Sequence, residues 1–127
     1  MAAGKYSFVI EQGATVEFEV QWTDSNGDKV DLTPYHGRMQ IRSGYGTTGT
    51  LYAQLSTSKA PDSTGLSLSG SRDTVDPKSG SIGIFISAAS SSNFTFEEAK
   101  YDLELVQGTT VTRLLEGKVK LSKEVTV

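Results

Sequence analysis

The stretch that decides the fold reads Tyr101-Asp-Leu-Glu-Leu-Val106, then Gln107-Gly-Thr-Thr110, then Val111-Thr-Arg-Leu-Leu-Glu-Gly-Lys-Val-Lys120. Its first and third segments alternate apolar and polar residues, which is the pattern of β-strands with one buried face. The Gly/Thr segment between them is typical of a short turn. In the last segment the alternation is interrupted at Leu114-Leu-Glu-Gly117, as it is where a bulge kinks a strand. We therefore predict a β-hairpin with a kinked return strand.

The same alternation recurs toward the N-terminus. The clearest case runs from Val16 to Trp22, where every second residue is apolar and the intervening ones are Glu or Gln. Asn26-Gly27 follows, and this dipeptide is the strongest short turn signal. Further short strands are predicted near Tyr6–Ile10, Arg38–Arg42, Leu51–Leu55, Leu66–Leu68 and Ile82–Ile86. Surface loops rich in Gly, Ser, Thr, Pro or Asp are predicted at Ser43–Gly49, Ser58–Gly65 and Ser69–Gly80.

Helical signals are scarce. The best candidate is Ala88–Ala99, but its first half is dominated by Ser and Asn, whose side chains compete with helical hydrogen bonding. About eight short strands at hairpin spacing, with almost no helix, are typical of an antiparallel β-sandwich. We therefore expect residues 1–127 to form a single all-β domain, an antiparallel, immunoglobulin-like β-sandwich of about eight strands. At most one short helical turn is expected, near residues 88–99.

Length and charge narrow the possible classes of protein. The 127 residues fit one domain with a hydrophobic core. The formal net charge of −3 argues against a nucleic-acid or anionic-membrane partner, which would favour clustered Lys and Arg. Because cysteine is absent, disulfides, thiol nucleophiles and Cys-ligated zinc are excluded. Met1–Tyr6 does not resemble a signal peptide, and no apolar run approaches the ~18 residues of a membrane helix, so we expect synthesis and assembly in the cytoplasm.

The residue patterns that carry chemistry in other proteins are weak here. His36 is the only histidine, so a zinc site would have to rest on carboxylates, and no signature marks a serine nucleophile for it. Asp24–Asp28 has its glycine too early for an EF-hand loop and reads as a hairpin turn. Gly44–Gly49 lacks the spacing and the Lys-Ser/Thr ending of a phosphate loop. Asn93-Phe-Thr95 matches the glycosylation sequon, which has no meaning without a secretory route. We predict no enzyme activity, no cofactor and no metal site.

Several residues are candidates for contacts with a partner. Trp22, Tyr6 and Tyr101 are in phase with apolar neighbours and are predicted to lie in the core, whereas the other tyrosines fall in loops or near strand edges. The charged strand positions Glu17, Glu19, Arg38, Arg42, Asp102 and Glu104 are either solvated faces or pair across subunit interfaces. The alternating segment Leu121–Val127 either completes the sheet of its own domain or adds to that of a neighbour. The predicted interface residues are Tyr35, Arg38, Arg42, Tyr45, Tyr52, Val125 and Val127.

Taken in order, these segments resemble a group of small bacteriophage virion structural proteins. The resemblance lies in Ile10–Thr15, the Val16–Trp22 strand, Trp22–Gly27, Val30–Tyr35, Arg38–Arg42, Tyr101–Leu105 and Val111–Val119. It is similar to the N-terminal β-sandwich of phage baseplate and receptor-binding-protein adaptors, and residues 45–80 are least alike. The resemblance implies a non-enzymatic subunit of the tail or baseplate that joins larger parts or attaches fibres. Because the chain stops after the sandwich, we expect a small connecting or decorating subunit.

The resemblance also implies where and with what the protein assembles. Its partners would be other virion structural proteins of the tail, baseplate or capsid, in many copies and in a symmetric assembly, with no nucleic acid and no membrane. Its location would be the virion. Two alternatives stay open at this stage. One is a capsid cement protein that decorates neighbouring capsomers, and the other is a carbohydrate-binding module for glycans of the host surface.

Overall fold

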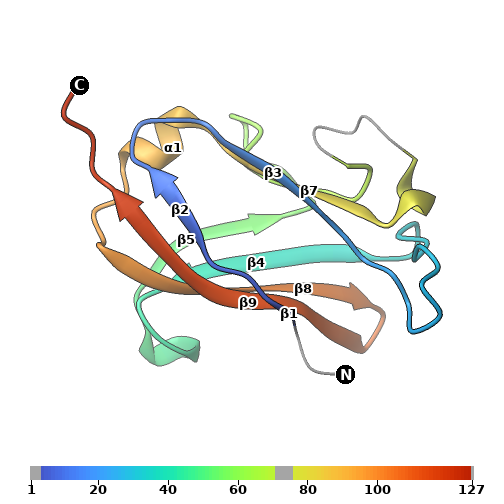
Figure 1. The fold of residues 1–127 in the computed structure, drawn as a ribbon. Coiled ribbons are helices and arrows are strands. Elements are labelled where there is room, and N and C mark those ends of the chain that lie inside the picture. Colours follow the sequence, from blue (N-terminus) through green and yellow to red (C-terminus); the bar gives the residue numbers. More distant parts are fainter. Residues whose placement is uncertain (1–3, 71–75, 127) are drawn as a thin grey trace.

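The computed structural model describes residues 4–70 and 76–126, and in this part the chain is all-β (Figure 1). The all-β prediction is thereby confirmed. Among the described residues, helical structure is limited to the helix α1 (Ala88–Ser92) and the 3₁₀ turns η1 (Gly46–Thr48) and η3 (Pro77–Ser79). The described strands are β1 (Gly4–Lys5), β2 (Phe8–Glu11), β3 (Val16–Gln21), β4 (His36–Arg42), β5 (Leu51–Ser56), β6 (Gly65–Ser67), β7 (Ser81–Ile86), β8 (Glu98–Gln107) and β9 (Thr110–Ser122).

The strands form two sheets. The larger sheet has the order β1-β9-β8-β4-β5, with β2 also paired to β9, and the smaller sheet has the order β3-β7-β6. Most ladders are antiparallel, but β1 and β2 run parallel to β9. The expectation of a purely antiparallel arrangement is therefore wrong at the N-terminal strand. Alternation in the sequence tells which residues face the core, but it does not tell which strand lies alongside.

The predicted hairpin is formed by β8 and β9, which are the two longest strands (Figure 1). Gln107 pairs with Thr110 across a two-residue turn in which Gly108 has φ = 60°, a conformation that glycine adopts without strain. The register shifts where Leu103 pairs with Leu115 but Glu104 pairs with Arg113, so Leu114 is an extra residue. The break in alternation is thus a β-bulge, and the predicted kink is confirmed.

The core lies between the two sheets, and both contribute to a single cluster of buried side chains. In Figure 1, β3 and β7 form a layer that faces β4 and β8. The central residues of the cluster, each at most 1% exposed, are Ile10, Leu32, Met39, Ile41, Leu55, Leu66, Ile82, Ile84, Ile86, Leu103, Leu105 and Val119. Apolar residues of the predicted strands therefore bury against one another, as their period of two requires.

The aromatic residues predicted for the core are divided between three environments. Tyr101 is buried, as predicted, and Trp22 is half-buried against the core. Tyr6 differs from the prediction, since it is 43% exposed and packs against Phe8 and Phe18 with ring centroids 6.2 and 5.7 Å away. The physical reason is its position in the interruption between β1 and β2, two short segments that both pair with β9, so that Tyr6 does not belong to a regular strand.

A close backbone crossing fixes this N-terminal segment. The Tyr6 amide donates to the Glu116 carbonyl (3.0 Å), and the Tyr101 hydroxyl donates to the Tyr6 carbonyl (2.6 Å). Gly117 lies opposite Tyr101, and a side chain at this position would overlap the Tyr6 carbonyl. Burial raises the pKa of the Tyr101 phenol, so the hydroxyl remains a donor at ordinary pH.

The edge strand β5 also departs from simple alternation. Ile41 pairs with Ala53 whereas Arg42 pairs with Leu51, so Tyr52 is an extra residue in β5. This irregularity turns Leu51 outward, where it is 43% exposed, although the sequence places it on one face with Ala53 and Leu55. Tyr52 is half-buried and stacks on Phe96, with ring centroids 4.7 Å apart.

The helical turn expected near residues 88–99 is α1, and it is short for the predicted reason. Ser87 caps its first turn by accepting a hydrogen bond from the Ser90 amide (3.0 Å). Asp62, from the loop between β5 and β6, accepts from the hydroxyls of Ser87 (2.5 Å) and Ser90 (2.7 Å). These bonds, the one from Ser87 first, hold the pKa of Asp62 far below its usual range. The turns η1 and η3, outside this segment, were not expected.

At its other end β9 pairs with β2 as far as Ser122, which lies opposite Glu11. Residues 123–126 belong to no strand, so the C-terminal segment completes the domain's own sheet only through Ser122. Val127 lies outside the described residues. None of the helices in the described part of the chain is long and apolar enough to span a membrane.

Candidate functional site

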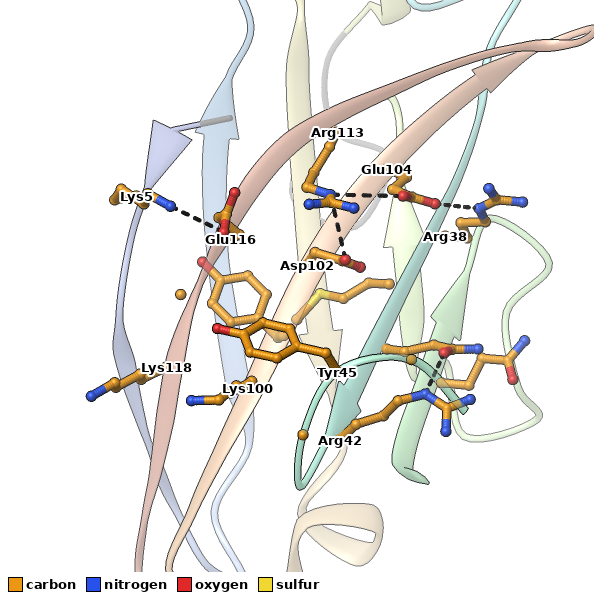
Figure 2. A pocket seen from close by; sticks show the side chains of 17 residues that line it. Lys5, Arg38, Arg42, Tyr45, Lys100, Asp102, Glu104, Arg113, Glu116 and Lys118 are labelled. Atoms are coloured by element: carbon orange, nitrogen blue, oxygen red, sulfur yellow. Dashed lines mark hydrogen bonds and ion pairs between the residues drawn. The ribbon is translucent and has the colours of Figure 1, made fainter. Parts of the chain in front are cut away.

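The outer face of the larger sheet carries a hollow of about 680 Å³ (Figure 2). Strand alternation builds it: Met39 and Ile41 of β4 point into the core, so Arg38, Gln40 and Arg42 point outward. The outward residues of β8 and β9 continue the floor, and the loop after β4 forms one wall. The bulge at Leu114 matters here because it brings Arg113 and Glu116, three positions apart, to the same face.

The charged side chains of this face lie in three rows that run across β4, β8 and β9. Arg38, Glu104 and Arg113 are directly opposite one another, and we call them the alternating row. Gln40, Asp102 and Glu116 form the next row, which we call the acidic row. Arg42, Lys100 and Lys118 form the third, the basic row. Figure 2 shows the alternating row at one end of the hollow and the basic row at the other.

The alternating row is held by ion pairs within the chain. Arg38 Nε donates to Glu104 Oε1 at 2.7 Å, and Arg113 Nε lies 3.9 Å from Glu104 Oε2. Arg113 Nε is also 3.6 Å from Asp102 Oδ2. Only a fifth of the Glu104 side chain is exposed, so its charge is partly shielded from water and compensated from both sides.

In the acidic row two carboxylates face each other. Lys5 of β1 compensates Glu116, with Nζ 3.0 Å from Oε2. Burial raises the pKa of Asp102, and the neighbouring Glu104 carboxylate adds to this effect, whereas Arg113 opposes it. Ionised Asp102 is therefore less favourable in the folded protein than in water.

The basic row has no comparable compensation. Arg42 donates from Nε to the Gln40 side-chain oxygen (2.8 Å) and from Nη1 to the Gly49 carbonyl (2.9 Å), both of which are neutral. Lys100 Nζ lies 5.3 Å from the centre of the Tyr45 ring, a cation–π geometry. Within residues 4–70 and 76–126, the only ion pair of the row is that of Lys118 with Glu98, at 3.9 Å.

Tyr45 is presented by a loop that is closed on itself. Ser43 and Thr50 exchange hydrogen bonds, from the Ser43 amide to the Thr50 carbonyl (2.9 Å) and from the Thr50 amide to the Ser43 hydroxyl (2.8 Å). A side chain at Gly49 would come within 2.6 Å of the Gly44 backbone, so the two ends of the loop touch. The Tyr45 side chain is 77% exposed at the wall of the hollow. The prediction that Gly44–Gly49 is a loop is confirmed. Because hydrogen bonds and close backbone contact join its two ends, we call it the pinned loop.

The structure brings three of the seven predicted interface residues together, since Arg38, Arg42 and Tyr45 all line the hollow. Tyr35 is half-buried and meets Trp22 edge to face, with ring centroids 5.4 Å apart. Tyr52 is engaged by Phe96, as described above. Val125 is 96% exposed, away from the hollow's lining, and Val127 lies outside the described residues. No contact with a partner is part of the structure, so these residues stay predictions as an interface.

Two side chains of the basic row, Lys100 and Lys118, were missed in the sequence. Alternation within residues 98–107 places Lys100 on an outward face, but only the register of β8 against β4 and β9 reveals that it lies between two other cations. The Arg38–Glu104 contact likewise required the register. It satisfies these two predicted surface charges within the chain.

The other candidate residues do not converge on a site. His36 is exposed at the first position of β4. Asp24 accepts hydrogen bonds from the amides of Asn26 (2.9 Å) and Asp28 (3.0 Å), so Asp24–Asp28 is the predicted turn. Among the described residues, no group of three or more His, Asp or Glu side chains is placed to hold a metal ion. The hollow offers ammonium, guanidinium and carboxylate groups beside the exposed ring of Tyr45, a set suited to recognition by ion pairing and contact.

Comparison with known proteins adds no relative to this picture. The sequence matches no protein-family model, and no curated protein matches it.

Proposed function

We propose that the protein is a non-enzymatic docking subunit of a bacteriophage virion, a tail or baseplate component that connects larger parts or attaches fibres. The observation that carries the docking role is the hollow on the outer face of the larger sheet, with its charged rows and its pinned, exposed tyrosine. The virion setting is supported by the resemblance of the sequence segments to small phage structural proteins.

We further infer that the two sheets form an immunoglobulin-like β-sandwich. The order β3-β7-β6 in one sheet and β9-β8-β4-β5 in the other corresponds to strands B-E-D and G-F-C-C′ of that fold. In this correspondence β2 is the first strand of the fold. It pairs in parallel with β9, the last strand, and not with the smaller sheet. A scaffold of this kind holds one broad sheet face rigid, and a rigid face loses little entropy on binding.

Composition of the hollow supports contact with protein. Tyr and Arg are enriched in protein interfaces because each combines a large contact area with directional hydrogen bonding. Here Tyr45 stands beside Arg42, and Arg38 and Arg113 lie at the opposite end. A single face of this size gives modest affinity, which many copies in a symmetric assembly multiply.

One alternative, a capsid cement protein, can be separated from this function by its copy number per particle. A tail or baseplate subunit is expected in multiples of three or six per particle, whereas a capsid cement protein is expected in hundreds. Quantitative protein staining of purified virions measures this number directly. Absence of the protein from purified virions would overturn the virion assignment.

Carbohydrate binding is favoured by one observation, the exposed ring of Tyr45 beside a polar hollow. Tyr35 and Tyr52 do not strengthen it, because Trp22 and Phe96 already cover one face or edge of each ring. A glycan array decides the matter. If the protein binds a sugar, Tyr45→Ala is expected to abolish retention, and no retention of any glycan by the unaltered protein excludes this alternative.

A further inference from the structure

We propose that the basic row Arg42–Lys100–Lys118, together with Tyr45, binds an extended acidic segment of a partner protein. This inference rests on the proposed docking function and names the chemistry of the partner. The juxtaposition that carries it is a row of three cations on adjacent strands, directly opposite one another, beside an exposed aromatic ring.

The basic row is unfavourable for the folded chain alone. Like charges directly opposite on neighbouring strands repel each other, and side chains in such pairs are ~5 Å apart at their Cβ atoms. Lys100 has a cation on both sides, Arg42 on β4 and Lys118 on β9. The alternating row shows that the same strands accommodate Glu104 between two arginines. A carboxylate from a partner would compensate the cations of the basic row, as Glu104 compensates the two arginines of the alternating row.

The distribution of charge in the chain points the same way. Six of the 12 Lys and Arg residues line the hollow, compared with three of the 15 Asp and Glu residues. The hollow is therefore positive in a protein whose formal net charge is −3. A positive concavity on a negatively charged protein attracts acidic groups and directs them to one place.

The donors of the basic row are held ready for an anion. Arg42 uses two N–H groups on Gln40 and Gly49, which fixes the guanidinium, and among the described residues its other N–H groups have no hydrogen-bond partner. Lys100 is half-buried and lies over the ring of Tyr45, within the pinned loop. Such preorganisation lowers the entropy lost when a carboxylate binds.

The acidic row decides in favour of a protein segment over nucleic acid. Asp102 and Glu116 lie next to the basic row on the same two strands, and a phosphodiester backbone crossing the hollow would approach both carboxylates. A polypeptide strand can place an acidic residue against the basic row and, two residues on, a basic residue against the acidic row. The acidic row and the basic row are two residues apart on each of the three strands. This equals the spacing of residues on the same face of an extended peptide.

The test is a titration of the full chain, followed by amide chemical shifts, with an acetylated acidic peptide of three Thr-Glu-Thr-Thr repeats. A peptide with Gln in place of Glu, inorganic phosphate and a twelve-nucleotide oligo-dT are the comparison probes. We expect the acidic peptide to shift the amides of Tyr45, Lys100 and Lys118. Lys100→Glu should weaken its binding at least about tenfold. Lys29→Glu, an equal charge change at an exposed turn outside the hollow, should leave it nearly unchanged.

Lys100→Glu has a second readout that a purely structural lysine would not give. Because it replaces a like-charged row by an alternating one, the Tm of the free protein should rise while peptide binding is lost. A fall in Tm together with unchanged peptide binding would overturn the inference. So would equal binding of the Gln peptide, tighter binding of phosphate or oligo-dT, or no shift with any probe. Self-association of the unaltered protein that Lys100→Glu abolishes would identify a second copy as the occupant and also overturn it.

These outcomes are distinguishable from failure of the proposed function. If the protein binds the acidic peptide through Lys100 but is absent from purified virions, only the virion assignment is overturned. If the protein is present in virions but Lys100→Glu does not change its peptide binding, only the acidic-partner inference is overturned.

Discussion

Two rows of charged residues on one sheet face, four positions apart on β4 and β8, contrast in how their charges are satisfied. In the alternating row, Glu104 lies between Arg38 and Arg113 and pairs with both. In the basic row, Lys100 lies between Arg42 and Lys118, with its Nζ over the ring of Tyr45. The same three strands carry both rows, so the contrast in charge comes from the side chains. The ion pairs of the first row lie within the chain, and we propose that an anion of a partner supplies those of the second.

The largest expected effect comes from making the alternating row resemble the basic row. Glu104→Lys removes a charge-assisted hydrogen bond of 2.7 Å and aligns three cations, so we expect a loss of about 2 kcal/mol in the free energy of unfolding. Urea denaturation measures it. Glu104→Gln, which keeps the shape and removes the charge, should lose less. An unchanged unfolding midpoint in Glu104→Lys would mean that the alternating row does not stabilise the fold.

The acidic row between them gives a pH-dependent effect. Because burial raises the pKa of Asp102, its ionisation disfavours the folded state, and this penalty grows as pH rises above the ordinary value of about 3.9. Asp102→Asn removes the ionisation, so at pH 7 the variant should be at least as stable as the unaltered protein. Its advantage should vanish below about pH 3.9. Thermal unfolding from pH 3 to 8 tests this, and a variant less stable at pH 7 would show that the Arg113 ion pair outweighs burial.

A smaller effect is expected when the basic row is relieved without being reversed. Lys100→Gln removes the central charge, and we expect a gain of about 0.5 kcal/mol in the free energy of unfolding. High salt should stabilise the unaltered protein in the same way, because about 1 M NaCl screens the repulsion between the three cations. The variant should respond less to salt, because the central charge of the row is gone. Denaturation at low and high salt measures both. Equal salt dependence of the two proteins would mean that the three cations do not repel one another appreciably.

The smallest effect on stability is expected from a substitution of Tyr45, at the wall of the hollow beside the basic row. Tyr45 is 77% exposed, so Tyr45→Ala should change the free energy of unfolding by less than about 0.5 kcal/mol. Its effect should instead appear in binding of the acidic peptide, where the ring provides contact area. Phe at the same position keeps the ring and serves as the control. A large loss of stability in Tyr45→Ala would make the loop a structural element and not a contact surface.

The sequence predicts the local parts of this structure better than the distant ones. The β8–β9 hairpin, its turn and its bulge depend on neighbouring residues and were found from alternation. The parallel pairing of β2 with β9 was not, because the strands are more than a hundred residues apart and period two carries no information about neighbours. The same limit applies to the site. Arg38, Arg42 and Tyr45 were singled out, but the rows exist only through the register of three strands.

The parallel strand at the N-terminus has a consequence for how the chain folds. Its hydrogen bond from Tyr101 to the Tyr6 carbonyl spans 95 positions, and Phe8 meets Val119. During synthesis, therefore, β1 and β2 have no strand to join until β9 has left the ribosome, whereas the β8–β9 hairpin closes within about 1–10 μs once both strands are present. β1 and β2 are therefore made before the β8–β9 hairpin but are placed after it. Until then Tyr6, Phe8 and Val9 face water, and this interval is when nascent chains are most exposed to mispairing with one another.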